Sequence, residues 1–176
     1  MKKWTWFPAA IVSVLVPVVL ILSSIWLLIR PVFLEHEYNL KNFPADEYGF
    51  TTAERMQWGV LSLEYLRNAE GIKFLADLKF ADGTPIYNAR ELSHMEDVKT
   101  LVQLMYKILG GALVLFIALT LFAWQAKWLK EYFKALAAGG WLTLGLIVFI
   151  LAGTLVNFDE LFTQFHHLFF TGDTWL

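Results

Sequence analysis

Three long runs of apolar residues limit what this chain can fold into. They span residues 8–29, 108–124 and 139–156, and further apolar residues from Leu101 onward extend the second run upstream. A helix of about 20 apolar residues is long enough to cross the hydrocarbon core of a bilayer. A chain of 176 residues that is 57% hydrophobic and 17% charged cannot bury that much apolar surface in one soluble core. We therefore predict an all-α integral membrane protein with three transmembrane helices, at residues 8–29, 101–124 and 139–156.

The positions of the lysines predict how these helices are oriented. Two lysines precede the first run, and residues 125–138 hold three lysines against a single glutamate. Short lysine-rich segments stay in the cytoplasm. The first run is too long for the apolar part of a signal peptide and has no small-residue cleavage site after it, so we expect an uncleaved anchor. Residues 1–7 and 125–138 are then cytoplasmic, and residues 30–100 and 157–176 are extracytoplasmic.

The block of residues 30–100 is predicted to be mainly helical. Residues 51–54 (Thr-Thr-Ala-Glu) have the pattern of a capping box, which predicts a helix that ends near Gly71. Residues 72–80 suit either a short strand or a short helix. The pair Asn88 and Glu91 gives a second cap pattern, and nothing breaks a helix from about Ala89 into the second apolar run.

Four histidines, at positions 36, 94, 166 and 167, all fall on the predicted outer side. His36 is most simply a solvated surface residue. His94 has Arg90, Glu91 and Asp97 at helical spacings that place all three on its own face. A carboxylate beside an imidazole fixes its tautomer and favours its protonated form, as a general base requires. The alternative is an ordinary charged helix face.

The segment after the third run predicts an interfacial helix. If Asn157 caps a helix from Phe158 to about Phe169, its apolar residues gather on one face. Asp159 and His166 then lie at the edge of that face, and His167 points into water. This pattern is typical of a helix that lies in the membrane interface. The alternative is a phenylalanine-rich anchor whose histidines are incidental.

Two histidines near one membrane surface, each with a carboxylate neighbour, suit acyl or proton transfer on a lipid. A metal-dependent hydrolase that uses Asp97 or Asp159 is a weaker hypothesis, because no paired-histidine metal motif is present. The chain has no cysteine, and Ser93 points about 100° away from its neighbour His94 on a helix. The net charge of −2 does not favour nucleic-acid binding. A membrane scaffold whose outer block binds a partner remains a further alternative.

Two stretches of this sequence resemble a family of bacterial membrane proteins, the lipoprotein intramolecular transacylases. One is residues 88–99 (Asn-Ala-Arg-Glu-Leu-Ser-His-Met-Glu-Asp-Val-Lys), just before the second apolar run. The other is residues 165–170 (Phe-His-His-Leu-Phe-Phe), followed by Trp175-Leu176. The family pattern Phe-His-x-x-Phe-Phe matches His166 rather than His167.

The resemblance implies transfer of the sn-2 acyl chain of a diacylglyceryl lipoprotein to the α-amino group of its own N-terminal cysteine. It implies catalytic roles for His94 and His166, without a metal or an organic cofactor, at the outer face of a bacterial cytoplasmic membrane. Orienting roles are then expected for Arg90, Glu91, Asp97 and Asp159, and substrate-binding roles for Asn88, Phe165, Phe169 and Trp175. The partners expected are the lipoprotein substrate and membrane lipid. The family continues past the Trp-Leu pair into a fourth membrane helix, whereas this chain ends at Leu176.

Overall fold

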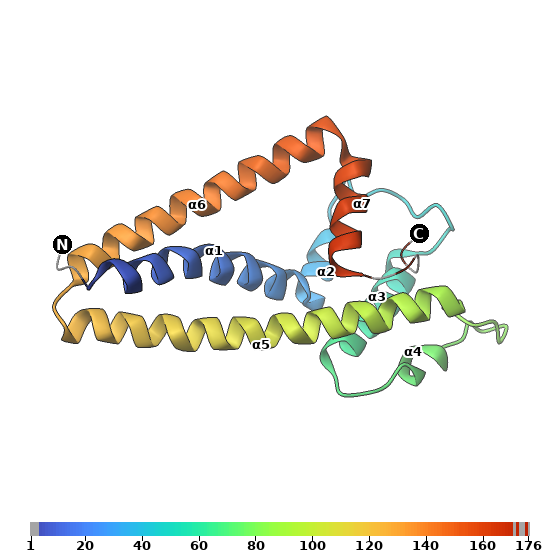
Figure 1. Ribbon diagram of the computed structural model, residues 1–176. Coiled ribbons are helices and arrows are strands. Elements are labelled where there is room, and N and C mark those ends of the chain that lie inside the picture. Colours follow the sequence, from blue (N-terminus) through green and yellow to red (C-terminus); the bar gives the residue numbers. More distant parts are fainter. Residues whose placement is uncertain (1–3, 171, 173–174, 176) are drawn as a thin grey trace. The chain divides into compact units, whose positions relative to one another are not determined.

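The computed structural model describes residues 4–170, 172 and 175 of the chain. Over these residues it is all-helical, with a single isolated β-bridge between Lys79 and Pro85 (Figure 1). The helices are α1 (Trp6–Leu28), α2 (Pro31–Tyr38), α3 (Thr52–Arg67), α4 (Lys73–Ala76), α5 (Ala89–Gln125), α6 (Leu129–Val156) and α7 (Phe158–Phe169). The predicted all-α fold is therefore confirmed.

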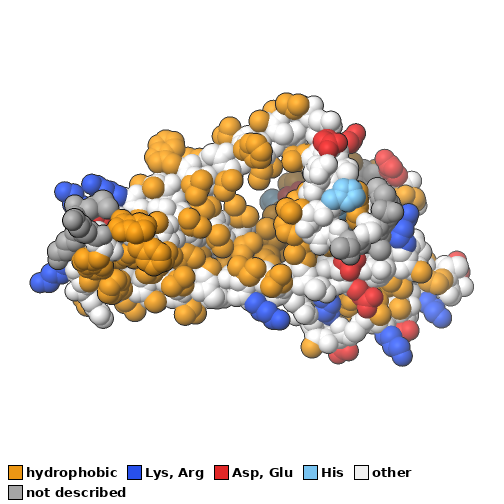
Figure 2. Space-filling model, viewed as in Figure 1, with side chains coloured by type: hydrophobic (Ala, Val, Ile, Leu, Met, Phe, Trp, Pro, Cys, Tyr) orange, Lys and Arg blue, Asp and Glu red, His pale blue; other side chains and the backbone are white. Residues whose placement is uncertain are grey.

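Three helices, α1, α5 and α6, are long and apolar enough to cross a membrane, as predicted. In the most apolar stretch of each, only 11%, 17% and 17% of the residues are buried within the protein. Hydrophobic side chains accordingly cover much of the surface over these helices in Figure 2. Apolar surface on this scale is not stable in water and needs lipid around it. The chain is a membrane protein that divides into two compact units, Met1–Ser24 with Met105–Leu168 and Ile25–Leu104 with Phe169–Leu176.

In the first unit, α1 and α6 approach closely at a proline and a glycine. Pro17 lies inside α1 and has no N–H, so the carbonyl of Ser13 loses its usual helical donor. Gly139 of α6 packs against that carbonyl, since a Cβ atom there would lie 2.7 Å from Ser13 O and 2.6 Å from Val16 Cβ. The Ser13 hydroxyl donates to the Ala135 carbonyl at 3.0 Å. The absence of a side chain at Gly139 thus lets the two helices approach closely, and the hydrogen bond from the Ser13 hydroxyl joins them.

The turn between α5 and α6 holds the core of this unit. Trp128 and Tyr132 are almost fully buried there with small residues of α1, α5 and α6. The Tyr132 hydroxyl donates to Thr120 Oγ1 at 2.6 Å, because the Thr120 hydroxyl itself donates to the Phe116 carbonyl. The sequence predicts a loop over residues 125–138, but α6 already begins at Leu129. Residues 129–138 contain good helix formers and no breaker, so the helix extends through them.

In the second unit, α3 begins at the predicted capping box. The Thr51 side chain accepts from the Glu54 N–H at 3.2 Å, and the Glu54 carboxylate accepts from the Thr51 N–H at 2.8 Å. The Thr51 N–H and the Thr51 hydroxyl, the latter at 2.7 Å, both donate to the Glu54 carboxylate and lower the pKa of Glu54 below its ordinary value. The helix ends at Arg67, before the expected stop at Gly71, because the Asn68 side chain accepts from the Glu70 N–H and turns the chain there.

Two short helices of this unit were only partly predictable. Helix α2 is not among the elements expected from the sequence; it has Pro31 at its first position, where a proline is well tolerated. In the segment 72–80, predicted as a short strand or a short helix, residues 73–76 form α4 and Lys79 makes the isolated bridge.

A buried lysine fixes α5 to the end of α3. The ammonium group of Lys99 donates to Asn68 Oδ1 at 3.0 Å and to the Glu70 carbonyl at 2.6 Å. It also lies 4.0 Å from the centre of the Tyr65 ring, a cation–π distance. Burial raises the pKa of the Tyr65 phenol, and the negative charge of Glu96 raises it further. These contacts hold the part of α5 that follows His94.

Candidate active site

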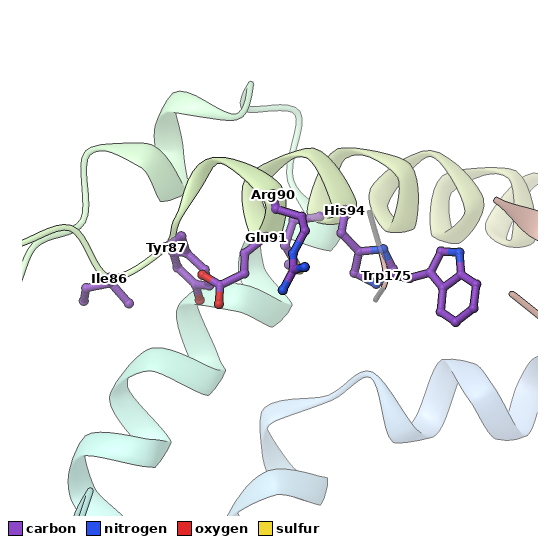
Figure 3. Close-up of a pocket in the computed structure, with 7 residues that line it drawn as sticks. Ile86, Tyr87, Arg90, Glu91, His94 and Trp175 are labelled. Atoms are coloured by element: carbon purple, nitrogen blue, oxygen red, sulfur yellow. The ribbon is translucent and has the colours of Figure 1, made fainter. Parts of the chain in front are cut away.

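A hollow of about 500 Å³ opens beside the first two turns of α5 (Figure 3). The side chains of Arg90, Glu91 and His94 project from one side of the helix toward it. The other residues that line it are Ile86, Tyr87, Met95 and Trp175. Four residues singled out from the sequence (Arg90, Glu91, His94 and Trp175) are therefore brought together in the second unit. A hollow of this size suits a small-molecule site.

The first turn of α5 is closed by a reciprocal pair of hydrogen bonds between Asn88 and Glu91. The Asn88 N–H donates to the Glu91 carboxylate at 2.8 Å, and the Glu91 N–H donates to Asn88 Oδ1 at 3.0 Å. These bonds satisfy two N–H groups that a helix start would otherwise leave unpaired. Glu91 thus has a structural role, and so has Asn88; the predicted orienting and substrate-binding roles remain predictions. Arg90 is the other charged side chain that lines the hollow.

Tyr87 forms a wall of the hollow and is braced by α3. The Ser62 hydroxyl donates to the Trp58 carbonyl at 2.8 Å, so the Tyr87 hydroxyl is the donor in its 2.6 Å contact with Ser62 Oγ. Tyr87 is not among the residues singled out from the sequence, because its partner lies 25 residues away in the chain. The feature that could have drawn attention to Tyr87 is its position as an aromatic residue directly before Asn88, the cap residue of α5.

His94 is half-buried among aromatic side chains. Its ring lies 5.3 Å from the ring of Phe170 at 62°, an edge-to-face arrangement. The indole of Trp175, whose Nε1 donates to the Gly172 carbonyl at 3.1 Å, lies toward the imidazole (Figure 3). Phe170 therefore packs against the imidazole and reduces its exposure to water. Phe170 belongs to the Phe-His-x-x-Phe-Phe motif, but no pattern in the sequence pairs it with His94.

The first unit holds His166 on α7, which has the bounds that the sequence predicts. Asn157 caps this helix by accepting from the Glu160 N–H at 3.2 Å. His166 Nδ1 donates to the Phe162 carbonyl, one turn earlier, at 2.8 Å. In the neutral imidazole, Nε2 then carries the lone pair and can accept a proton. The ring also packs on Phe162 at 4.0 Å and on Phe165 at 5.5 Å, so its orientation is well defined.

The residues predicted to assist the two histidines have different surroundings. Asp159 is exposed in the first turn of α7, and seven residues of helix place it about 10 Å from His166 along the axis. It can act on His166 through its charge but not by direct contact. Asp97 is half-buried one turn after His94. Phe165 and Phe169 keep about half of their surface exposed, as a lipid-facing side would. Roles for these four residues remain predictions.

Within residues 4–170, 172 and 175, no three histidine or carboxylate side chains are grouped so that they could hold a metal ion.

Comparisons with known proteins give one relative and one family. An "Uncharacterized protein" of Aquifex aeolicus (strain VF5) is 27% identical over 143 residues, which cover 81% of this chain. The matched part is only 63% of that relative, so the chain spans less than two thirds of the relative's length. No solved structure matches the chain. The family model described as "Lipoprotein intramolecular transacylase Lit" matches residues 10–176. Since that match covers nearly the whole sequence, the chain belongs to the lipoprotein intramolecular transacylase family.

Proposed function

We propose that this protein moves the sn-2 acyl chain of a diacylglyceryl lipoprotein to the α-amino group of the lipoprotein's N-terminal cysteine. The amine attacks the ester carbonyl, an amide bond forms and the ester bond to the glyceryl oxygen breaks. The proton lost by the amine ends on the released glyceryl hydroxyl, which leaves a lyso-form lipoprotein. The observation that carries this proposal is the family match over residues 10–176, which includes both histidine motifs.

We propose that His94 and His166 both take part. The hydrogen bond from His166 Nδ1 to the Phe162 carbonyl leaves Nε2 as the proton acceptor, which suits a base that deprotonates the amine. His94 is half-buried beside aromatic side chains and Arg90. In its protonated form it can donate to the oxyanion that develops on the ester, and a site with little water strengthens that interaction. Because amine and ester belong to one substrate molecule, the protein needs no nucleophile of its own.

We further propose that the reaction takes place at the outer face of a bacterial cytoplasmic membrane. The lysines before α1 and between residues 125 and 138 favour a cytoplasmic location for those segments. With three spanning helices, the His94 and His166 segments then both lie on the opposite side. A lipid ester is found at the depth where a spanning helix leaves the hydrocarbon core, so this location suits the substrate.

The test is the lipid state of a reporter lipoprotein in cells that express the protein or its variants, read by mass spectrometry of the N-terminal peptide. His94→Ala and His166→Ala should each reduce the lyso-form by a factor of about 10²–10⁴, the usual contribution of acid–base catalysis. His167→Ala is the matched control, because it removes the adjacent, exposed histidine of the same helix and should have little effect. Lyso-form production that persists with His94→Ala at equal expression would refute the proposal and favour a scaffold. Loss of activity on treatment with a chelator would instead favour metal-dependent chemistry.

A further inference from the structure

A second hollow, of about 700 Å³, lies in the second unit where α1 ends and α2 begins. It shares no lining residue with the hollow at His94. Its walls are mixed: Trp26, Leu27 and Phe33 are among the apolar residues, whereas Arg30 and Arg67 contribute positive charge. None of the residues described as lining it is acidic. The hollow therefore combines an unneutralised positive charge with apolar surface.

Arg30 is held in place by one aromatic ring, yet part of its guanidinium lacks a partner. Its central carbon lies 3.9 Å from the centre of the Trp26 ring, a close cation–π contact. Its Nε is buried and has no hydrogen-bond partner in the part of the chain that the structure describes. Buried donors are nearly always paired in folded proteins, so an unpaired one calls for an explanation. A buried Nε is not reached from the hollow, so a ligand there would meet the terminal nitrogens of the Arg30 guanidinium instead.

Arg67 reaches the same hollow from the last turn of α3. Its Nε donates to the Leu63 carbonyl at 3.1 Å, which fixes the side chain and keeps its terminal nitrogens for another acceptor. Neither Arg67 nor Arg30 forms an ion pair with any residue among 4–170, 172 and 175. Two positioned guanidinium groups without a carboxylate match the geometry in which arginine binds phosphate.

We propose that this hollow binds the phosphate-bearing headgroup of an anionic phospholipid. The two arginines would hold the phosphate, and the apolar wall, with Phe33 and Leu27, would contact the glycerol and the start of the acyl chains. Arg30 directly follows the first apolar run, 8–29, which is the depth at which lipid headgroups lie. This lipid differs from the substrate proposed above, because a diacylglyceryl group carries no phosphate. The proposal rests on the chain being a membrane protein and does not depend on the acyl transfer.

The experiment measures binding of phosphatidylglycerol to the purified full-length chain in a neutral detergent, by native mass spectrometry over a series of lipid concentrations. Wild type should bind phosphatidylglycerol more tightly than zwitterionic phosphatidylcholine. Arg30→Gln and Arg67→Gln should each weaken phosphatidylglycerol binding about fivefold, the factor typical of one cationic side chain near an anionic lipid surface. Lys73→Gln, which removes an exposed positive charge on α4 of the same unit, is the matched control and should bind as wild type does.

Further measurements distinguish a lipid site from a phosphate site and from the effects of misfolding. Arg67→Lys keeps the charge but loses the guanidinium geometry, so its affinity should lie between those of wild type and Arg67→Gln, whereas a merely misfolded variant would bind no better than Arg67→Gln. His94→Ala should bind phosphatidylglycerol normally, so that failure of the lipid site and failure of the acyl transfer are read independently. If inorganic phosphate alone competes as well as the lipid does, the site is a phosphate site and the lipid assignment is wrong. Equal phosphatidylglycerol affinities in Arg30→Gln, Arg67→Gln and Lys73→Gln would overturn the proposal.

Discussion

Replacing Gly139 with alanine adds a methyl group at the point where α6 passes α1. The new Cβ would lie 2.6 Å from Val16 Cβ and 2.7 Å from the Ser13 carbonyl oxygen. Carbon–carbon contacts in packed proteins are about 3.5–4.0 Å, so relief of the tighter contact, with Val16, requires the helices to separate by roughly 0.9–1.4 Å. That movement would also stretch the 3.0 Å hydrogen bond from Ser13 to Ala135. Overpacking of this kind costs about 1–3 kcal/mol.

The better helix propensity of alanine offsets up to about 1 kcal/mol of this cost, which leaves a net loss of up to about 2 kcal/mol for Gly139→Ala. For a chain of this size, that corresponds to a decrease in Tm of up to roughly 8 °C. The assay is thermal unfolding in detergent followed by the fluorescence of the tryptophans. Gly140→Ala is the matched control: nothing lies within 4 Å of its added Cβ, so it should be neutral or slightly stabilising. A Tm of Gly139→Ala equal to or above that of Gly140→Ala would refute the packing argument.

Three further changes test the second unit. Lys99→Ala removes the donor to Asn68 and to the Glu70 carbonyl, and should lower the stability measured in thermal unfolding by about 1–3 kcal/mol. It should also expose residues 68–70 to protease. Unchanged cleavage at residues 68–70 would contradict the anchoring role of Lys99. Thr51→Ala should destabilise the protein by about 1 kcal/mol at pH 7 through loss of the cap. The pKa of the Glu54 carboxyl, the partner of Thr51, is lowered in the folded state. The stabilisation from the ionised Glu54 is therefore present above its ordinary pKa of 4.5 and is lost as the pH falls below that value. The difference in stability between wild type and Thr51→Ala should accordingly shrink when unfolding is measured toward pH 3. Tyr87→Phe and Ser62→Ala should each cost about 1 kcal/mol, and the double variant should cost clearly less than their sum because both remove one hydrogen bond.

Local patterns in the sequence were sufficient to predict several elements. The helix from Ala89 and the helix from Phe158 were predicted from cap residues and from the absence of breakers, and the structure has both. The capping box at residues 51–54 was predicted from the three-residue spacing between Thr51 and Glu54. The spanning helices follow from length and apolarity alone. In each case the determining interactions lie within a few residues along the chain.

Several contacts that the sequence does not predict join distant residues. Lysines are rarely buried, so nothing in the sequence indicates that Lys99 is buried against the turn at Asn68, 31 residues earlier. The contact between His94 and Phe170 likewise joins residues far apart in the chain. Glu91 shows another limit: its position suits both a cap and a partner for His94, and only the three-dimensional structure shows that its carboxylate is bound to the Asn88 N–H.

The reciprocal hydrogen bonds between Asn88 and Glu91 also affect the fraction of time that His94 spends in its native position. Helix ends fray, and a terminal turn without a cap opens and closes within about a microsecond. His94 is only the sixth residue of α5, so fraying of one or two turns would unwind the backbone that carries it. Two reciprocal hydrogen bonds at the first turn make such openings rarer. The cap therefore raises the fraction of time for which the imidazole is in position when a slow chemical step takes place.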